Sequence, residues 1–203
     1  MKKLLILSTL FLVCSCSNVE LSLNNSINSI VSTPETKTTK ILFNDITETD
    51  GTDYSKEPAL SSFKNKFINS DSLLFKDISG VSKIFATELK VNNETLVHSV
   101  RLGSSKEAGT FVVSTNMPVS KIIVNAHDYI NYVEYTNSWL HDSAKLSIND
   151  ITNELEHSTG SQIINSTLTY EFDEPTASFT FKNTQIDTNT KYRIQLNYIE
   201  FIC

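Results

Sequence analysis

Apolar and polar residues alternate along most of the chain after the first forty positions. The candidate strands are short, lie between turn residues, and span 40–43, 73–75, 81–86, 96–102, 110–114, 121–126, 145–149, 167–172, 177–181 and 192–202. Alternation of this kind predicts strands with one buried face. Residues 55–69 differ, because Pro58 lies near their start and apolar residues recur at helical spacing. Leu60, Phe63 and Phe67 would share one face, so we expect a single helix there.

The C-terminal strands predict part of the core. We expect five alternating residues to face a common interior: Leu168, Tyr170, Phe172, Phe179 and Phe181. A turn at Asp173-Glu174-Pro175 would separate the two strands that carry them, and a loop containing Pro118 would separate another pair. The last strand would bury Tyr192, Ile194, Leu196 and Tyr198 and then switch its apolar face at Ile199 and Phe201, which predicts a β-bulge.

The number and order of these elements predict the fold class. About nine or ten short strands, one short helix and no alternation of strands with helices favour an all-β protein. The strands would pair as an antiparallel β-sandwich of jelly-roll-like architecture.

The first sixteen residues follow a different pattern. Met1-Lys2-Lys3 precedes a ten-residue apolar run, 4–13, which is typical of an export signal and too short to span a bilayer as a helix. The sequence Val13-Cys14-Ser15-Cys16 follows. This ending resembles the lipobox of bacterial lipoproteins, and the resemblance implies that Cys16 carries a thioether-linked diacylglycerol. Cys14 is the competing acceptor, and a plain signal peptide is the alternative.

The lipoprotein resemblance divides the chain into three parts. Residues 1–15 would be the signal peptide, 16–39 the lipidated N-terminus with a polar tether, and 40–203 the β-sandwich domain. The tether is predicted because residues 17–38 are rich in Ser, Asn and Thr without sustained periodicity. Two acyl chains give a stable anchor, so we expect attachment to the extracytoplasmic side of the cell membrane. Cys203 would then be the one remaining thiol, without an internal disulfide.

A longer pattern lies in the second half of the chain. Its segments, in order, are Leu102-Gly103-Ser104-Ser105, Gly109-Thr110-Phe111, residues 119–126, Leu146-Ser147-Ile148-Asn149, Tyr192-Arg193-Ile194 and Ile199-Glu200-Phe201. This pattern resembles the β-sandwich domains appended to secreted and surface proteins of low-GC Gram-positive bacteria and mollicutes. Such domains are similar in architecture to jelly-roll carbohydrate-binding domains. The resemblance covers about half the chain and implies the fold more than the function.

Charge and motifs exclude several function classes. The net charge is −6, and loss of Lys2 and Lys3 with the signal would make it −8. An acidic surface repels phosphate backbones, so we expect no nucleic-acid partner. The sequence contains no GxSxG, P-loop or GxGxxG motif, so we expect neither enzyme activity nor a cofactor. Of the 17 basic residues, only Arg101 and Arg193 are arginines.

The best candidate for ligand binding is the long connection at residues 127–142. Four aromatic residues carry this prediction: Tyr129, Tyr132, Tyr135 and Trp139. Aromatic rings stack on the apolar faces of sugars, while neighbouring Asn, Asp and His side chains contact hydroxyls, so this segment could bind a glycan. The alternative is that the rings cap one end of the sandwich. Exposure of Trp139 and at least one tyrosine would favour binding.

Metal binding has weaker support. Five carboxylates surround Gly51, namely Asp45, Glu48, Asp50, Asp53 and Glu57. Gly51 and Glu57 match the sixth and twelfth positions of an EF-hand, but Ile46 occupies the first, where a carboxylate is required. We therefore expect a solvated acidic loop, with a different kind of calcium site as the alternative. The four histidines lack zinc-ligand spacing, so no metal is expected at His98, His127, His141 and His157.

Together these features predict a membrane-anchored surface lipoprotein. Its β-sandwich would be a non-catalytic binding or adhesion module for a glycan or for an envelope or host protein. The alternative is a structural envelope or assembly lipoprotein with no small ligand.

Overall fold

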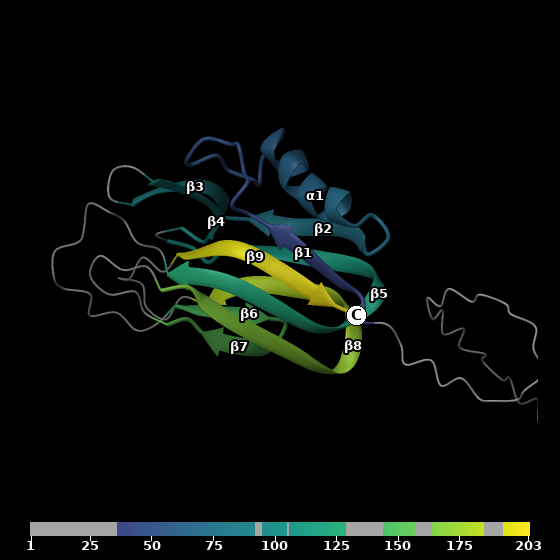
Figure 1. The fold of residues 1–203 in the computed structure, drawn as a ribbon. Helices are drawn as coiled ribbons and strands as arrows, with labels where there is room; N and C mark the ends of the chain where they lie inside the picture. The colour runs from purple at the N-terminus through teal and green to yellow at the C-terminus, as the bar shows by residue number, and fades with distance from the viewer. Residues whose placement is uncertain (1–35, 92–94, 105, 129–143, 157–163, 185–192) are drawn as a thin grey trace, which may run out of the picture. The chain divides into compact units, whose positions relative to one another are not determined.

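The computed structural model describes residues 36–91, 95–104, 106–128, 144–156, 164–184 and 193–203. One compact unit spans Thr38–Cys203. The described elements are β1 (Thr38–Leu42), α1 (Ala59–Ser70), β2 (Phe75–Ser82), β3 (Ile84–Val91), β4 (Thr95–Leu102), β5 (Thr110–Asp128), β6 (Lys145–Ile148), β7 (Ile151–Glu154), β8 (Ser166–Thr184) and β9 (Ile194–Ile202) (Figure 1). In this part of the chain, no helix is long and apolar enough to cross a membrane.

The strands form an antiparallel β-sandwich, which confirms the predicted fold class (Figure 1). β5 and β8 are each 19 residues long and belong to both layers. The first half of β5 pairs with β2 and with the second half of β8. The second half of β5 pairs with β9 and with the first half of β8. One layer therefore contains β3, β4, β9 and β1, and the other contains β2, β6 and β7.

Two predicted turns are wrong. β5 runs through Pro118, and β8 runs through Asp173-Glu174-Pro175, without either strand ending. The β5–β8 register shifts between Ser114 and Val119 and again before Lys121, so both strands bend where the turns were expected. Pro118 lies between paired positions, where its missing N–H removes no ladder hydrogen bond. At these two positions the turn-forming residues bend the strand, which passes from one layer to the other and does not end.

Two predicted strands also have different bounds. Candidate strand 81–86 is the end of β2 followed by the start of β3, because Lys83 adopts a left-handed backbone with a φ of 54°. Candidate strand 73–75 begins as a turn. Asp71 Oδ1 accepts two backbone N–H groups of this segment at 3.1 and 3.0 Å, which stabilises the turn before β2.

Helix α1 closes the side of the sandwich between β1 and β2. Phe63 and Phe67 are fully buried, as predicted, while Leu60 is half-buried. The Phe63 ring lies 5.6 Å from the Phe111 ring, and the Phe67 ring lies 5.5 Å from the Phe75 ring, both edge to face. Burying each phenylalanine side chain contributes about 1.5–3 kcal/mol, so these rings hold the helix against the sheets.

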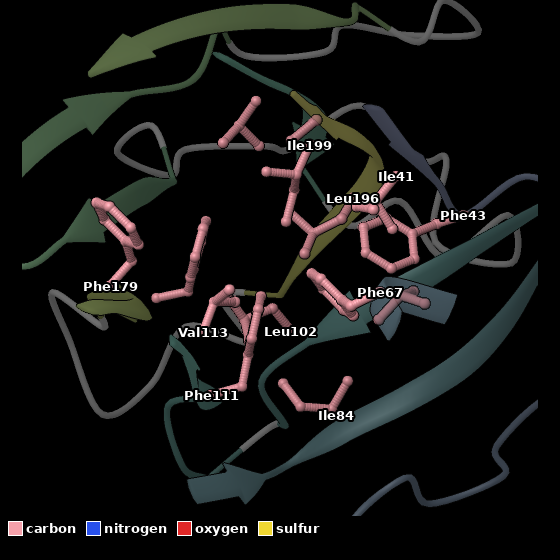
Figure 2. Close-up of a cluster of buried hydrophobic side chains, with 14 of the residues drawn as sticks. Ile41, Phe43, Phe67, Ile84, Leu102, Phe111, Val113, Phe179, Leu196 and Ile199 are labelled. Carbon is pink, nitrogen blue, oxygen red and sulfur yellow. The ribbon is translucent and has the colours of Figure 1, made fainter. Parts of the chain in front are cut away.

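The predicted core residues of β8 face the interior. Tyr170, Phe179 and Phe181 are fully buried, Leu168 is buried and Phe172 is half-buried. Phe181 pairs directly with a phenylalanine of β5, and the two rings stack 4.6 Å apart. Figure 2 shows Phe179 and Phe111 within the buried hydrophobic cluster. The alternation along β8 therefore identified the inner face correctly.

The predicted bulge in β9 is also confirmed. Asn125 pairs with Tyr198 and Ala126 pairs with Leu196, which leaves Asn197 as an extra residue. The apolar face accordingly switches from Leu196 to Ile199, both of which are fully buried. Tyr198 is half-buried rather than buried. Tyr192 lies outside the described residues.

Candidate functional site

A row of side chains crosses the layer formed by β3, β4, β9 and β5. Phe85 pairs with Arg101, Arg101 pairs with Gln195, and Gln195 pairs with His127. A second, shorter row pairs Thr87 on β3 with Ser99 on β4. We call these residues the outer-face cluster, comprising Phe85, Thr87, Ser99, Arg101, His127 and Gln195.

The outer-face cluster points away from the hydrophobic core. Side chains alternate along a strand, so the neighbours of the cluster on each strand face the opposite way. Those neighbours are the fully buried core residues Ala86, Val100, Ala126, Ile194 and Leu196. The sheet therefore separates an apolar inner face from a largely polar outer face.

The cluster is buried although it does not face the core. Its least accessible side chains are Ser99 and Gln195 at 0% exposure, His127 at 1% and Thr87 at 2%. Phe85 and Arg101 are half-buried and form its more accessible end. Polar side chains on the outer face of a sandwich are ordinarily solvated, so their burial needs a separate explanation.

Some hydrogen-bonding capacity in the cluster is unused. Gln195 Nε2 donates to Thr87 Oγ1 at 3.4 Å, which is a long hydrogen bond. Gln195 Oε1 and Ser99 Oγ are buried, and neither has a hydrogen-bond partner within the described part of the chain. Leaving a buried polar group unsatisfied costs about 1–3 kcal/mol. Such atoms call for a partner such as a bound ligand.

Two further contacts orient the cluster. The guanidinium carbon of Arg101 lies 4.6 Å from the centroid of the Phe85 ring, a cation–π geometry that positions the arginine. His127 Nδ1 lies 2.8 Å from the Asp128 carbonyl oxygen. A carbonyl only accepts, so Nδ1 carries the proton and Nε2 is an acceptor. Burial lowers the pKa of His127, which favours this neutral ring.

The rest of the same face is internally satisfied. Asn197 Nδ2 donates to Asn125 Oδ1 at 2.9 Å and to Asn165 Oδ1 at 2.8 Å. Lys40 Nζ lies 3.5 Å from the centroid of the Tyr198 ring, which covers one face of that ring. These groups bind one another, unlike Ser99 Oγ and Gln195 Oε1. The unsatisfied polar atoms of this face therefore lie at the end where β5 terminates.

The residues expected to bind a ligand or lipid lie outside the described residues. They are Tyr129, Tyr132, Tyr135, Trp139 and Cys16. The aromatic segment is nevertheless adjacent to the cluster in sequence. β5 ends at Asp128, one residue after His127, and Tyr129 follows directly. The prediction of binding by the four aromatic residues stays a prediction.

Sequence reasoning missed Thr87, Ser99 and Gln195 as site residues. A polar residue between Ile194 and Leu196 is the ordinary pattern of a half-exposed strand, so Gln195 gave no signal. The scarcity of arginine could have drawn attention to Arg101. Only the strand register, however, shows that Arg101 lies opposite Gln195.

The acidic loop at residues 45–57 covers the edge of β3. Gly51 N–H donates to Ala86 O at 3.0 Å, and Tyr54 N–H donates to Ile84 O at 2.9 Å. Asp50 Oδ1 accepts the N–H of Glu88 at 3.2 Å, which also ties the loop to this strand. The loop therefore protects an exposed sheet edge.

The carboxylates of this loop bind separate partners. Asp45 pairs with Lys66 at 2.6 Å, and Glu57 accepts a hydrogen bond from the Ser61 hydroxyl at 2.7 Å. Among the residues that the structure describes, no group of three or more His, Cys, Asp or Glu side chains could hold a metal ion. The calcium alternative therefore has no ligand set here.

Glu48 joins the loop to α1. Its carboxylate accepts hydrogen bonds from the Tyr54 hydroxyl at 3.1 Å and from the Ser62 hydroxyl. Burial opposes ionisation of Glu48, but the hydrogen bonds from Ser62 and Tyr54 outweigh it and lower the Glu48 pKa. Burial, together with the nearby Glu48 charge, raises the pKa of Tyr54. Glu48 therefore acts as an anionic acceptor between loop and helix.

A groove of about 730 Å³ lies between α1, β1 and this loop. Its lining includes Lys40, Leu42, Glu48, Ser61 and Asn65, and contains no aromatic ring. Of the ionic side chains in this lining, Glu48 is engaged by Tyr54 and Ser62, and Asp45 is paired with Lys66. The groove thus offers fewer unsatisfied groups than the outer-face cluster.

Comparisons with known proteins show likeness only to solved structures. No protein-family model and no curated protein matches the chain. A CBM36-1 domain of a multidomain xylanase from the hindgut metagenome of Trinervitermes trinervoides is 13% identical, with a TM-score of 0.33, over 56% of this chain and 83% of that domain. A family 35 carbohydrate binding module from Clostridium thermocellum is 10% identical, with a TM-score of 0.37, over 63% and 95%.

Part of a larger enzyme is also similar. The arabinose-bound MgGH51 α-L-arabinofuranosidase is 9% identical, with a TM-score of 0.45. The likeness covers 81% of this chain but only 26% of the enzyme chain. At these identities the similarity concerns the fold alone.

Proposed function

We propose that the protein is a membrane-anchored surface lipoprotein whose β-sandwich is a non-catalytic, glycan-binding module. The outer-face cluster carries this proposal. Ser99 Oγ and Gln195 Oε1 are buried on the non-core face without a partner in the described residues. Folding alone does not favour such an arrangement, whereas a ligand with polar groups would satisfy it.

The chemistry of the cluster suits a sugar. A sugar hydroxyl both donates and accepts hydrogen bonds, and the cluster contains donors and acceptors of both kinds, with Gln195 Oε1 as an acceptor and the Ser99 hydroxyl as both. The Phe85 ring supplies an apolar surface beside them. These side chains stand on paired strands, which hold them in fixed relative positions.

Binding rather than hydrolysis fits the composition of the cluster. Glycoside hydrolysis ordinarily uses a pair of carboxyl groups that flank the scissile bond. The six side chains of the cluster include no carboxylate, and burial lowers the pKa of His127, which favours its neutral form. A module without catalytic activity would act by holding the protein against a glycan surface.

The anchor part of the proposal rests on the N-terminal sequence. The Val13-Cys14-Ser15-Cys16 ending follows an apolar run of export-signal length. A diacylglycerol on Cys16 would attach the module to the extracytoplasmic side of the membrane, where glycans and envelope proteins are accessible.

A glycan-array screen of the purified full-length protein tests the binding function. We expect saturable binding to one class of oligosaccharide. Gln195→Ala and Trp139→Ala should each weaken it, while Thr180→Ala, an exposed position on β8, should not. Tryptophan fluorescence should change when the selected glycan is added, if Trp139 contacts it.

Three results would contradict the glycan-binding function. If no glycan binds, or if Gln195→Ala binds as well as the unchanged protein, the binding function is wrong. A structural envelope lipoprotein without a small ligand would then be the better account. The same conclusion would follow if Trp139→Ala unfolded the domain.

Membrane fractionation of a Cys16→Ser variant tests the anchor. Without the acceptor thiol, the protein should leave the membrane fraction and accumulate as an unprocessed precursor. Cys14→Ser is the matched control and should remain lipidated and membrane-bound. Unchanged retention and processing of Cys16→Ser would overturn the proposed anchor.

A further inference from the structure

The side chain of Gln195 reaches across a neighbouring strand on the outer face. Gln195 stands on β9, and its Nε2 donates to Thr87 Oγ1 on β3 at 3.4 Å. β4 lies between these two strands, and Ser99 on β4 pairs directly with Thr87. The Gln195 side chain therefore crosses β4 and brings its amide beside Ser99.

Two hydrogen-bonding atoms at this place are unused. Gln195 Oε1 is an acceptor, whereas the Ser99 hydroxyl both donates and accepts. Both atoms are buried and have no partner within the described part of the chain, so they do not bond to each other either. A ligand group that donates to Gln195 and accepts from Ser99 would satisfy both atoms.

The depth of these atoms restricts the group that can reach them. Ser99 and Gln195 are both 0% exposed, whereas Phe85, two residues before Thr87 on the same face of β3, is half-buried. A hydroxyl attached directly to a sugar ring would have to bring the whole ring to the buried atoms. A substituent that projects from the ring by several bonds reaches them while the ring stays beside Phe85, at the more accessible end.

The polarity of the two atoms restricts the group further. An ionised carboxylate offers acceptors alone and would leave Gln195 Oε1 unsatisfied. An ammonium offers donors alone, leaves the Ser99 hydroxyl proton without an acceptor, and costs far more to bury than a neutral group. A neutral amide supplies one donor and one acceptor, which is what the two atoms require.

We propose that the outer-face cluster binds a sugar that carries an acetamido group, an N-acetylhexosamine, an inference that rests on the proposed glycan-binding function. The acetamido N–H donates to Gln195 Oε1, and its carbonyl oxygen accepts from the Ser99 hydroxyl. The acetyl methyl group is the deepest part of the ligand, and its removal from water favours binding. The sugar ring lies beside Phe85.

Matched glycosides test the inference. Calorimetric titration of the full-length protein would compare methyl N-acetyl-β-D-glucosaminide with methyl β-D-glucoside, and methyl N-acetyl-α-D-galactosaminide with methyl α-D-galactoside. Each pair differs only in an acetamido group that replaces one hydroxyl. We expect at least one acetamido sugar to bind about tenfold or more tightly than its partner. Methyl β-D-glucosaminide, which keeps the nitrogen but lacks the acetyl group, should show no such gain.

A serine variant tests the contact with the acetamido carbonyl. Ser99→Ala should lower the preference for the acetamido sugar about fivefold or more, because the carbonyl loses its donor. The domain should remain folded, since the substitution removes an unsatisfied hydroxyl. Ser178→Ala is the matched control, because Ser178 is an exposed serine on the part of β8 that belongs to the other layer. That variant should keep the full preference.

Saturation-transfer NMR tests the depth of the group independently of any variant. When the protein is saturated, the acetyl methyl protons of the bound sugar should receive more saturation than its ring protons. Stronger saturation of the ring protons would overturn the inference.

The outcomes distinguish this inference from the proposed function. If glucosides and galactosides bind as tightly as their acetamido partners, or if Ser99→Ala keeps the full preference, the acetamido contact is wrong and glycan binding stands. Equal gain from the free amine would also overturn the acetamido contact. Failure of every glycan on the array would overturn both.

Discussion

Strand β9 places two kinds of buried residue side by side. Ile194 and Leu196 face the core, Gln195 between them faces away from it, and all three are fully inaccessible. The inner residues are buried because apolar side chains leave water and pack against other apolar groups. Burial of Gln195 brings no such gain, and its Oε1 lacks a partner in the described residues. The inner face therefore accounts for stability, and the outer face carries the proposed binding function.

Energetics separate the two faces further. On the inner face, Phe111 and Phe181 stack directly across the β5–β8 pair at 4.6 Å, so packing and register support each other. On the outer face, the hydrogen bond from Gln195 Nε2 to Thr87 Oγ1 is 3.4 Å long. Residues that lower the stability of the fold, and whose cost is not offset by other contacts within the protein, are typical of binding sites.

The largest effect is expected on the inner face. Phe179→Ala should lower the free energy of unfolding by about 3–5 kcal/mol, because it removes a fully buried ring and leaves a cavity. Guanidinium chloride unfolding would measure the change. Thr180→Ala, the exposed neighbour on the same strand, should change the stability by no more than about 0.5 kcal/mol. If the denaturation midpoint of Phe179→Ala equals that of the unchanged protein, the side of β8 that faces the core has been assigned wrongly.

A polar-to-apolar exchange on β9 distinguishes the roles of the two faces. Gln195→Leu should leave the free energy of unfolding unchanged or raise it by about 1 kcal/mol, because it removes an unsatisfied group, and it should abolish glycan binding. Leu196→Gln, the reverse exchange at the adjacent position, should destabilise the domain by about 2 kcal/mol or more. If Gln195→Leu were as destabilising as Leu196→Gln, Gln195 would stabilise the fold, and the outer face would not differ from the inner face in its role.

The smallest effect concerns pH. Burial lowers the pKa of His127 in the folded state, so its neutral form is favoured by folding. Its contribution to stability is fully present above the unfolded value of about 6.5 and is lost as pH falls through the folded pKa. His127→Gln should therefore flatten the decline in unfolding free energy below about pH 6.5. An identical pH profile for the variant would show that His127 does not titrate on unfolding.

Sequence patterns predicted the inner face well and the bends poorly. Alternation identified Tyr170, Phe179 and Phe181 because burial on one face requires a period of two. Pro118 and Asp173-Glu174-Pro175 were interpreted as turns, yet both strands continue through them. The same residue types favour a bend within a strand and a turn that reverses the chain. Which of the two forms depends on the pairing of β5 with β8, and this pairing joins residues far apart in the sequence.

The candidate site depends on information that a single strand does not contain. Ser99, Arg101 and Gln195 are polar at positions where an exposed face is expected, and nothing in the sequence separates them from solvated residues. Their convergence follows from the register of β3, β4, β9 and β5. The aromatic segment at residues 129–139 remains a sequence-based prediction.

Side-chain amide signals in solution NMR test the central claim most directly. The full-length protein would be titrated with the glycan selected on the array, and the Gln195 Nε2–H₂ resonances would be followed. Asn183 is the internal control, because its buried Oδ1 accepts the Gly109 N–H as part of the fold. We predict saturable shifts of the Gln195 signals, with those of Asn183 unchanged. Saturation of the protein without movement of the Gln195 signals would contradict it.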